Sequence, residues 1–526
     1  MSFARSVFTV SSLTIVSRIA GFIRDTATAM LLGAGPMADA AFVAQRLPNL
    51  FRSLFAEGAF SATFVPLYTA EREKNGEKAA QHFAGQALAL LLAVLIPFSG
   101  LIMLLMPFVV RVIAPGFEND PEKYGLTVTF SNITFPYLAL ISVTALQGGL
   151  LNAQGKFGAA AAAPIALNIV TIAALLGAHF LGFSIAYALS WSLTLGGAVQ
   201  LGFLAISCHR AGVPIPLALP KLSAQSRLLF KRIGPGALGA GATQVNMLLS
   251  TILASTLPTG IVACLSYADR LEQLPQGIVG VAVATTLLPL LARHVETGSE
   301  DNVRHYMSRA IEFCVMLGLP SAIGFVIAAH PIVQTLFEHG AFSPNDTTRT
   351  AQALAAYALG IPAFLAVKIF ASGFFARQDT ATPVKIALFA MMVNVVGAVS
   401  MLHSLQHVGI ALASSIAVTI NAVLLFVQLR RKGRMTDAKL IWRLPRLLSC
   451  SIGMGFVTWA LVGYTQDWFT GHRLWHEIGG LTAIIGVSAI AYGLMLHATG
   501  AMRWSDAVAV MKRSQKSGGD AAGDIG

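Results

Sequence analysis

Apolar stretches long enough to cross a lipid bilayer follow one another along nearly the whole chain. A membrane-spanning helix needs about 20 mostly apolar residues. Fourteen stretches meet that requirement: 8–32, 40–69, 84–113, 127–152, 159–181, 183–207, 229–256, 261–291, 307–330, 350–375, 384–402, 409–429, 446–465 and 475–498. The sequence therefore predicts an all-α polytopic membrane protein with about 14 transmembrane helices.

The composition agrees with lipid as the surrounding solvent. Of the 526 residues, 55% are hydrophobic and 11% are charged, whereas soluble domains carry about 25% charged residues. The first apolar stretch contains two arginines and lacks a cleavage site with small residues, so we interpret it as a retained span rather than a signal peptide.

The basic residues predict the orientation in the membrane. With the N-terminus in the cytoplasm, about 26 of the 36 Lys and Arg residues fall in cytoplasmic segments, four fall in outer loops and six lie inside spans. Cytoplasmic loops of membrane proteins carry such an excess. We therefore expect a multi-pass membrane protein with both termini in the cytoplasm. The excess also explains the net charge of +12 without nucleic acid. The cluster Arg430, Arg431, Lys432 and Arg434 could in addition contact anionic membrane lipids.

An internal repeat relates two six-span halves. Ala44-Gln45-Arg46-Leu47 resembles Ala268-Asp269-Arg270-Leu271, and Gly149 and Gln154 match Gly373 and Gln378 at the same offset along the chain. Six spans are an even number, so the halves are expected to run in parallel, as in transporters that hold substrate between their halves.

This repeat predicts the domain organisation. We expect an N-terminal six-helix lobe over 1–208, a cytoplasmic linker over 209–228, a C-terminal six-helix lobe over 229–430, two extra transmembrane helices over 431–500, and a partly disordered cytoplasmic tail over 501–526.

Six cationic residues lie inside spans, where a charge costs about 2.5–3.5 kcal/mol and therefore faces protein or water. They are Arg18, Arg24, Arg46, Arg52, Arg270 and Lys368. Each could reach an interface or pair with an acid, and the acids available are Asp25, Asp39, Glu57, Asp269 and Glu272. For Arg46 and Lys368 the sequence leaves structural and functional roles equally open.

The other four arginines favour a cavity. Arg18 and Arg24 point about 120° apart on one helix, which suits a helix bordering a wide space. Arg52 follows Pro48-Asn49, and Arg270 precedes Pro275. Such helix breaks are tolerated at membrane depth where they line a cavity. Arginine also makes forked contacts with phosphate.

Other motifs give little support for an enzyme. Residues 234–239 match GxGxxG, but no strand precedes them, so a dinucleotide site is not indicated. The twelve histidines show no metal-ligand spacing, and the four cysteines form no CxxC pair. We expect no cofactor, no metal and no catalytic residue.

Five sequence blocks stand out, namely Ser17-Arg18-Ile19-Ala20-Gly21-Phe22-Ile23-Arg24-Asp25, the segment from Ala38-Asp39 to Leu47-Pro48-Asn49-Leu50-Phe51-Arg52, Phe55-Ala56-Glu57-Gly58, Tyr267-Ala268-Asp269-Arg270-Leu271 and Ala376-Arg377-Gln378-Asp379-Thr380. Together they resemble the MurJ (MviN) lipid II flippase family, which belongs to the multidrug, oligosaccharidyl-lipid and polysaccharide exporter superfamily. The resemblance covers nearly the whole chain.

The resemblance implies a transporter of peptidoglycan synthesis in the cell inner membrane rather than an enzyme. Its members flip lipid II, the undecaprenyl-diphosphate-linked disaccharide-pentapeptide, to the periplasmic leaflet by alternating access. It implies substrate-binding roles for Arg18, Arg24, Arg52 and Arg270, and cavity or gating roles for Asp25, Asp39, Asn49, Glu57 and Asp269. It also implies lipid II and membrane lipids as partners, with cell-wall synthesis proteins as further candidates.

Two other functions stay open at this point. The chain could export another polyprenyl-linked oligosaccharide, or it could be a membrane scaffold for cell-wall enzymes. A scaffold would tolerate loss of the arginines inside the spans but not of its loops.

The orientation can be tested by labelling single cysteines. In a variant lacking Cys208, Cys264, Cys314 and Cys450, a cysteine in 115–125 or 331–348 should react with an impermeant thiol reagent in intact cells. A cysteine in 71–82, 209–227 or 430–443 should react only after the membrane is opened. Labelling of 430–443 from outside would contradict the orientation.

Overall fold

The computed structural model describes residues 3–55, 59–216, 218–221, 227–229, 244–282, 287–431, 433, 437–471 and 473–501. These residues form helices and no strands. Their helices fall into two compact units, Met1–Ala263 with Gly340–Phe342, and Cys264–His339 with Ser343–Gly526. We call these unit 1 and unit 2.

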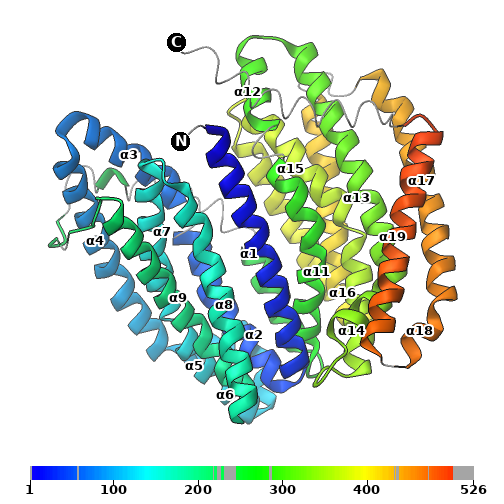
Figure 1. Cartoon of the computed structure of the whole chain (residues 1–526), viewed down its shortest axis with the longest axis horizontal. Coiled ribbons are helices and arrows are strands. Elements are labelled where there is room, and N and C mark those ends of the chain that lie inside the picture. Colours follow the sequence, from blue (N-terminus) through cyan, green and yellow to red (C-terminus); the bar gives the residue numbers. More distant parts are fainter. Residues whose placement is uncertain are drawn as a thin grey trace. The chain divides into compact units, whose positions relative to one another are not determined.

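Unit 1 contains the first ten labelled elements and an additional helical segment at Gln244–Ser255. The elements are α1 (Phe3–Leu32), α2 (Pro36–Phe55), α3 (Ala59–Asn75), α4 (Glu77–Leu104), α5 (Met106–Ile113), the 3-10 helix η1 (Pro115–Asn119), α6 (Pro121–Thr134), α7 (Tyr137–Ala153), α8 (Phe157–Leu181) and α9 (Ile185–Arg210). Figure 1 shows α1 lying beside α8, and these two helices pack together along their length.

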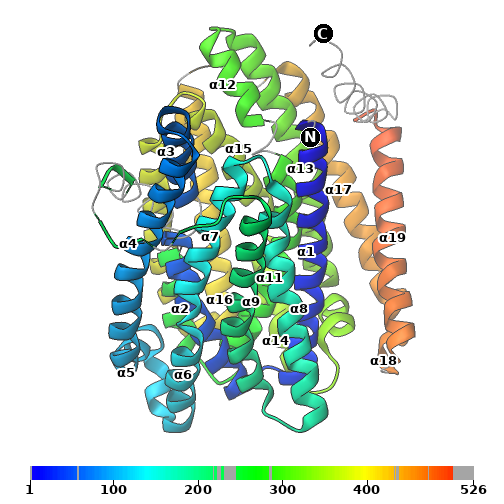
Figure 2. The ribbon, with the colours of Figure 1, turned by 60° about the vertical axis from the view of Figure 1, so that its left-hand side comes forward.

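Unit 2 contains the remaining helices. They are α11 (Ile261–Ala282), whose first three residues belong to unit 1, α12 (Leu288–Glu296), α13 (Glu300–Phe337), α14 (Pro344–Ala358), α15 (Ile361–Phe375), α16 (Ala381–Arg431), α17 (Ala438–Tyr464), α18 (Gln466–Thr470) and α19 (Leu474–Ala498). Helix α13 packs against α14, α15 and α17, and α17 packs against α19. The α17–α19 pair is seen best in Figure 2.

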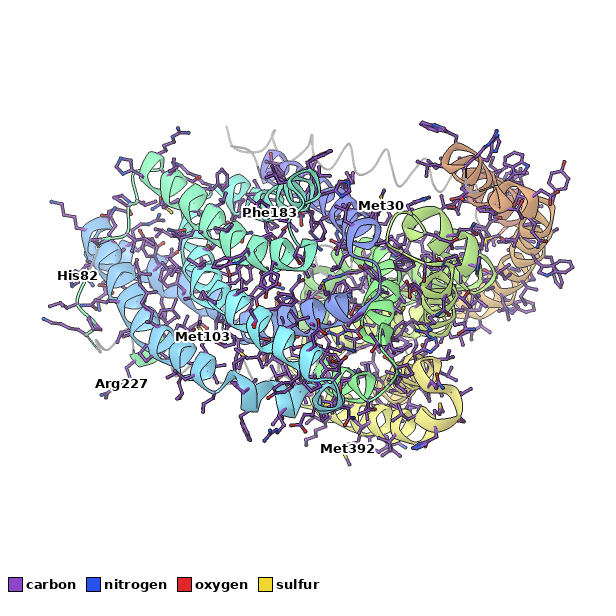
Figure 3. The ribbon with its side chains drawn as sticks, turned by 90° about the horizontal axis from the view of Figure 1, so that it is seen from below. Met30, His82, Met103, Phe183, Arg227 and Met392 are labelled. Atoms are coloured by element: carbon purple, nitrogen blue, oxygen red, sulfur yellow. The ribbon has the colours of Figure 1, made fainter. Side chains whose placement is uncertain are left out.

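The described helices are those of a multi-pass membrane protein. Seven single helices among those described are long and apolar enough to cross a membrane, and α6 with α7, taken together as Pro121–Ala153, makes an eighth span. The pair α14 and α15 adds a ninth if that pair, bent by 40°, is one span. The count of about 14 spans therefore stays a prediction. Large apolar side chains are exposed on these helices, such as Met392, 64% exposed and pointing outward from α16 in Figure 3. Such side chains suit contact with lipid.

The repeat reappears in the positions at which helices begin. Phe157 and Ala381, which begin α8 and α16, are separated by the same offset as the matched blocks that start at Ala44 and Ala268. The starts of α7 and α15 share that offset, and the starts of α4 and α13 follow it to within a single position. The offset seen in short sequence matches thus extends to whole helices. The two units therefore share the same order of these helices.

Two prolines free backbone carbonyls that hydroxyl groups from neighbouring helices then satisfy. Proline lacks an N–H, so the carbonyl four residues earlier loses its helical partner. For Pro48 that carbonyl is Ala44 O, which accepts a hydrogen bond from Thr134 Oγ1 of α6 at 3.1 Å. For Pro320 it is Met316 O, which accepts from the Tyr492 hydroxyl of α19 at 2.9 Å.

Helices α17 and α19 are fastened to α13 along their length. Besides Tyr492, Gln334 Nε2 of α13 donates to Phe469 O of α18 at 2.8 Å. At the beginning of α17, Arg309 of α13 donates to both oxygens of Asp437 at 2.9 and 3.0 Å. Arg309 also pairs with Glu312, which accepts from Arg443 of α17 at 2.6 Å. The four side chains form a continuous chain of alternating charge.

Asp437 makes this fastening sensitive to acid. Burial raises the pKa of Asp437, but the N–H of Leu440 and the Arg309 guanidinium outweigh it and hold that pKa below its usual value. A lowered pKa means that the carboxylate stabilises the fold above the unfolded-state value of about 4, and that this stability is lost as the pH falls through the folded-state value.

We predict that Asp437→Ala lowers the free energy of unfolding by about 1–3 kcal/mol at neutral pH, because it removes a helix cap and a charged pair. Asp437→Asn should keep the cap and lose less. Thermal unfolding in detergent from neutral pH to acid should show wild type losing stability toward the alanine variant. A constant difference between them throughout this range would contradict the assignment.

Candidate substrate-binding site

The arginines proposed from sequence are divided between the two units. Arg18, Arg24 and Arg52 belong to unit 1, and Arg270 belongs to unit 2. Each group is therefore described within its own unit.

Arg24 is held by two partners in the middle of α1. Its Nε and Nη2 donate to Asp25 Oδ1 at 2.9 and 2.6 Å, and its Nη1 donates to Asn168 Oδ1 of α8 at 3.0 Å. The Asn168 amide in turn donates to Ser17 O at 3.0 Å. The guanidinium is thus fixed in direction and partly neutralised. Asn168 was missed by sequence reasoning because a lone asparagine in an apolar stretch carries no motif.

Arg18 differs from Arg24 in its surroundings. Arg18 is exposed, whereas Arg24 and Asp25 are half-buried. The two arginines on α1 therefore meet different environments, as the angle of about 120° between them requires. A guanidinium in the exposed position keeps its charge available to an anion.

Arg52 lies one turn after the Pro48 break, where its position is set locally. Its Nε donates to Asn49 Oδ1 at 3.2 Å, and the Asn49 amide donates to Gln45 O at 2.9 Å. The structure thus brings Arg52 and Asn49 together. It does not leave the Ala44 carbonyl open to a cavity, because Thr134 occupies it.

Asp39 forms the most buried ion pair among the described residues. Its side chain is 1% exposed and that of Lys123, in α6, is 4% exposed, with Oδ2 and Nζ 2.7 Å apart. Asp39 Oδ2 also accepts from Gly260 N at 2.8 Å, and Oδ1 accepts from Ala263 N at 2.9 Å. Lys123 Nζ in addition lies 3.9 Å from the centroid of the Phe117 ring.

Through these bonds Asp39 fastens the first turn of α11 to α2. A carboxylate that accepts from N–H groups at a helix start is favourable for the helix dipole, and the ammonium balances its charge. The sequence places Lys123 in an outer loop, far from Asp39 along the chain. The buried position of Lys123 was therefore not predicted.

Two further charged residues from the sequence analysis belong to unit 1, and the structure describes one of them, Arg46. Arg46 does not pair with Asp39 but donates to Thr251 Oγ1, and to Met247 O at 3.3 Å, in the segment Gln244–Ser255. Glu57 lies outside the described residues.

A second contact within unit 1 links the end of α1 to Gly340–Phe342, which follows α13 in the chain. Ala341 N donates to Met30 O at 2.8 Å. Gly33 and Gly340 have φ of +67° and +63°, and a Cβ at either would lie 2.4 Å from the backbone oxygen of Ala341 or Met30 respectively. Glycine is required at both positions, because a side chain would collide with the backbone and strain the turn.

In unit 2 the polar residues of α11 lie close together. Arg270 is exposed, and Asp269 accepts from Gln273 Nε2 at 2.8 Å. Glu272 is buried and accepts from Gln276 Nε2, whose backbone carbonyl accepts from Lys368 of α15 at 3.5 Å. Lys368 is therefore joined to α11 through Gln276. Among the described residues no group of acids, histidines and cysteines could hold a metal ion.

A sequence model of one family covers most of the chain. The family is described as lipid II flippase MurJ, and residues 28–478 match it. The chain belongs to the MurJ family. Members of this family are transporters, not enzymes.

Curated relatives agree over nearly their full length. The chain is 42% identical over 473 residues to a probable lipid II flippase MurJ of Rhizobium meliloti, covering 89% of this chain and 88% of the relative. It is 40% identical to one of Rhizobium tropici, covering 95% of each. It is 33% identical to the lipid II flippase MurJ of Burkholderia cenocepacia, covering 90% and 92%.

Solved structures show the same fold. A lipid II flippase MurJ in an inward closed conformation matches with a TM-score of 0.77 at 24% identity, covering 93% of this chain and 99% of that chain. An inward-facing multidrug resistance MATE transporter of the MOP superfamily matches with a TM-score of 0.69 at 15% identity, covering 81% and 97%.

The Asp39–Lys123 pair can be tested by a double-mutant cycle. Asp39→Asn or Lys123→Met alone should lower the free energy of unfolding by roughly 3–5 kcal/mol, because each leaves a buried charge without its partner. The double variant should lose less than the sum. Thermal unfolding in detergent measures all three.

The exposed pair Arg111–Glu118 of the same unit is the matched control. Arg111→Met and Glu118→Gln should each change stability by about 1 kcal/mol or less. If the Asp39 and Lys123 variants are as mild as these, the buried pair does not hold α11.

Proposed function

We propose that this protein flips lipid II from the cytoplasmic to the periplasmic leaflet by alternating access. The supporting observation is the family match over residues 28–478, which includes Arg52 and Arg270. The relatives at 33–42% identity bear the same flippase name over nearly the whole length of the chain. The fold of an exporter superfamily supports transport independently of the name.

The cargo explains why arginines are needed. Lipid II carries a diphosphate, sugars and a peptide with carboxylates, and burying such charges in hydrocarbon without partners is prohibitively costly. Guanidinium groups present several donors in a fixed fork that fits phosphate. In the proposed mechanism Arg18, Arg24, Arg52 and Arg270 bind the head group, while the polyprenyl tail stays in lipid.

The contacts of the acids support a net positive site. The charge of Asp39 is balanced by Lys123 and so is not available to offset the arginines. Asp25 pairs with Arg24 and offsets its charge. We infer that Asp25 and Asn168 hold Arg24 in position and that Asn49 does the same for Arg52. Asp39 would act as a gating residue through its hold on α11, and Glu57 and Asp269 remain proposed cavity residues.

The proposed location follows from the basic-residue asymmetry and the family. We place the protein in the cell inner membrane with both termini cytoplasmic, and we place Gly33–Pro36 at the end of a first span that bends as the gate moves. Cell-wall synthesis proteins are proposed as further partners.

Purified protein in proteoliposomes tests the function directly. Fluorescent lipid II should move between leaflets only in vesicles that contain the protein, whereas a scaffold would leave it in place. An unrelated polyprenyl-linked oligosaccharide in the same vesicles should move more slowly. Equal rates for both lipids would favour a broader exporter.

Replacing Arg24, Arg52 or Arg270 by Ala should abolish flipping while expression stays near normal. Each lost charged hydrogen bond costs about 1.5–3 kcal/mol, or roughly ten- to hundredfold in head-group affinity. Lysine should restore little, since it lacks the fork. Binding and flipping in proteoliposomes measure both effects.

Arg304→Ala, which removes an arginine paired with Asp301 on α13, is the control and should behave as wild type. Asn168→Ala should weaken flipping less than Arg24→Ala, because it leaves the charge and removes only its support. Normal flipping in Arg24→Ala, Arg52→Ala and Arg270→Ala alike would overturn the site.

A further inference from the structure

Glu272 is a carboxylate buried in a helix of the membrane domain. It lies in α11 and is 9% exposed. An ionised carboxylate in such surroundings is costly unless a cation or several donors compensate it. Its partners therefore decide whether it can stay ionised.

The donors around Glu272 are few. Gln276 Nε2 donates to Oε1 at 2.6 Å, and this is its one hydrogen bond within the described part of unit 2. No ion pair within 4.0 Å involves Glu272 in that part of the chain. Asp269, one turn earlier on α11, adds a second negative charge rather than a compensating one.

Lys368 and Arg270 make no ion pair with Glu272 in the described part of unit 2. Lys368 of α15 donates to the Gln276 backbone carbonyl at 3.5 Å, and its Nζ lies 4.8 Å from the centroid of the Phe364 ring. Arg270 follows Asp269 on the exposed side of α11. Cys314 of α13, a buried thiol, is a further titratable group of unit 2. Gln276 contacts both charged side chains, the Lys368 ammonium through its backbone carbonyl and the Glu272 carboxylate through its side-chain amide.

We propose that Glu272 is a proton-binding site, and that it takes up and releases one proton during the transport cycle. Binding converts the carboxylate to a neutral carboxylic acid, and release restores the charge. The Gln276 amide accommodates both forms, because its NH₂ donates to the carboxylate and its side-chain oxygen can accept from the acid after the amide rotates.

A proton fits this site better than a metal ion. Sodium, magnesium or calcium would need several oxygen ligands, whereas Glu272 has one side-chain contact, with the Gln276 amide, in the described part of unit 2. Among the described residues no group of three or more His, Cys, Asp or Glu side chains could hold a metal ion. Lys368, reaching the same helix, would also repel a cation.

The role in a transport cycle rests on the proposed flippase function, whereas proton binding itself does not. Releasing the proton creates a negative charge in α11, the helix whose Gln276 carbonyl accepts from Lys368. A change of one charge in a low-dielectric region shifts the balance between conformations strongly. Glu272 would thereby link the state of α11, which also carries Arg270, to the proton concentration.

Infrared difference spectroscopy of the full-length protein in lipid vesicles tests proton binding. The pH-difference spectrum of wild type should contain a carboxylic-acid C=O band that is missing in Glu272→Gln. Glu296→Gln, which changes an exposed acid of α12, should keep that band. If Glu272→Gln removes no titrating band over the pH range in which the protein stays folded, the proposal is wrong.

Flipping in the same vesicles tests coupling. With the membrane potential held at zero, an imposed pH gradient should change the flipping rate of wild type and Glu296→Gln by up to about tenfold per pH unit. Glu272→Gln should still flip lipid II at a rate that ignores the gradient. A full gradient response in Glu272→Gln overturns the coupling.

The two proposals fail in different ways. If wild type moves no lipid II, the proposed function fails while the infrared band still reports whether Glu272 binds a proton. If lipid II moves and the band is absent, only the proton site fails.

Discussion

The need to satisfy every backbone polar group in a lipid environment shapes the rest of this structure. A helix satisfies its own backbone groups, so a carbonyl freed by a break in the helix must accept a hydrogen bond from a neighbouring helix. Thr134 and Tyr492 are such partners, since each donates its hydroxyl to a carbonyl that a proline has freed. These bonds do more than repair a helix. Thr134 joins α6 to α2 near Arg52, and Tyr492 joins α19 to α13.

Charged groups follow the same constraint at higher cost. Asp39 is buried with Lys123 and two backbone N–H groups, so its carboxylate has a cation and two further donors as partners and fastens the first turn of α11. Arg24 is half-buried and shares its donors between Asp25 and Asn168. Glu272 has a single amide for a partner within the described part of unit 2. These three charged groups differ in how many partners of opposite charge or hydrogen-bonding groups they have. That difference distinguishes the structural role of Asp39 from the proposed binding of an anion by Arg24 and of a proton by Glu272.

The sequence predicted what periodic or local signals encode. Apolar runs predicted the helical spans of α8, α9 and α19 to within a few residues, and short matches at a constant offset predicted the repeat that the starts of α7 and α15 display. Charges inside apolar spans led to the arginines, and the family resemblance implied their substrate-binding roles. Contacts between distant segments were not accessible. From the sequence, Lys123 is expected to be a charged residue of an outer loop, and only the fold brings it to Asp39. Asn168 has no sequence signal that points to Arg24.

The compact units have other bounds than the predicted lobes, whose boundaries stay a prediction. A six-span count favours a boundary near the linker 209–228, whereas the compact units separate between Ala263 and Cys264. The physical reason lies in contacts that the chain makes after that linker. Asp39 binds the N–H groups of Gly260 and Ala263, and Arg46 binds Thr251, so this stretch belongs with unit 1 by contact.

Charge movement decides how a proton site could serve a flippase. A unit charge that crosses the whole membrane exchanges about 2.3 kcal/mol with a potential of 100 mV, and a diphosphate with about two charges exchanges roughly 4–5 kcal/mol. Export of the proposed cargo from a negative interior is therefore favourable without any proton. One proton at Glu272 contributes at most about half as much from the same potential. Its stronger effect would be local, because gaining or losing a charge at a buried position of α11 changes which conformation of that helix is stable. A proton site of this kind would set the timing and direction of the conformational step, while the potential acting on the cargo would supply most of the driving force.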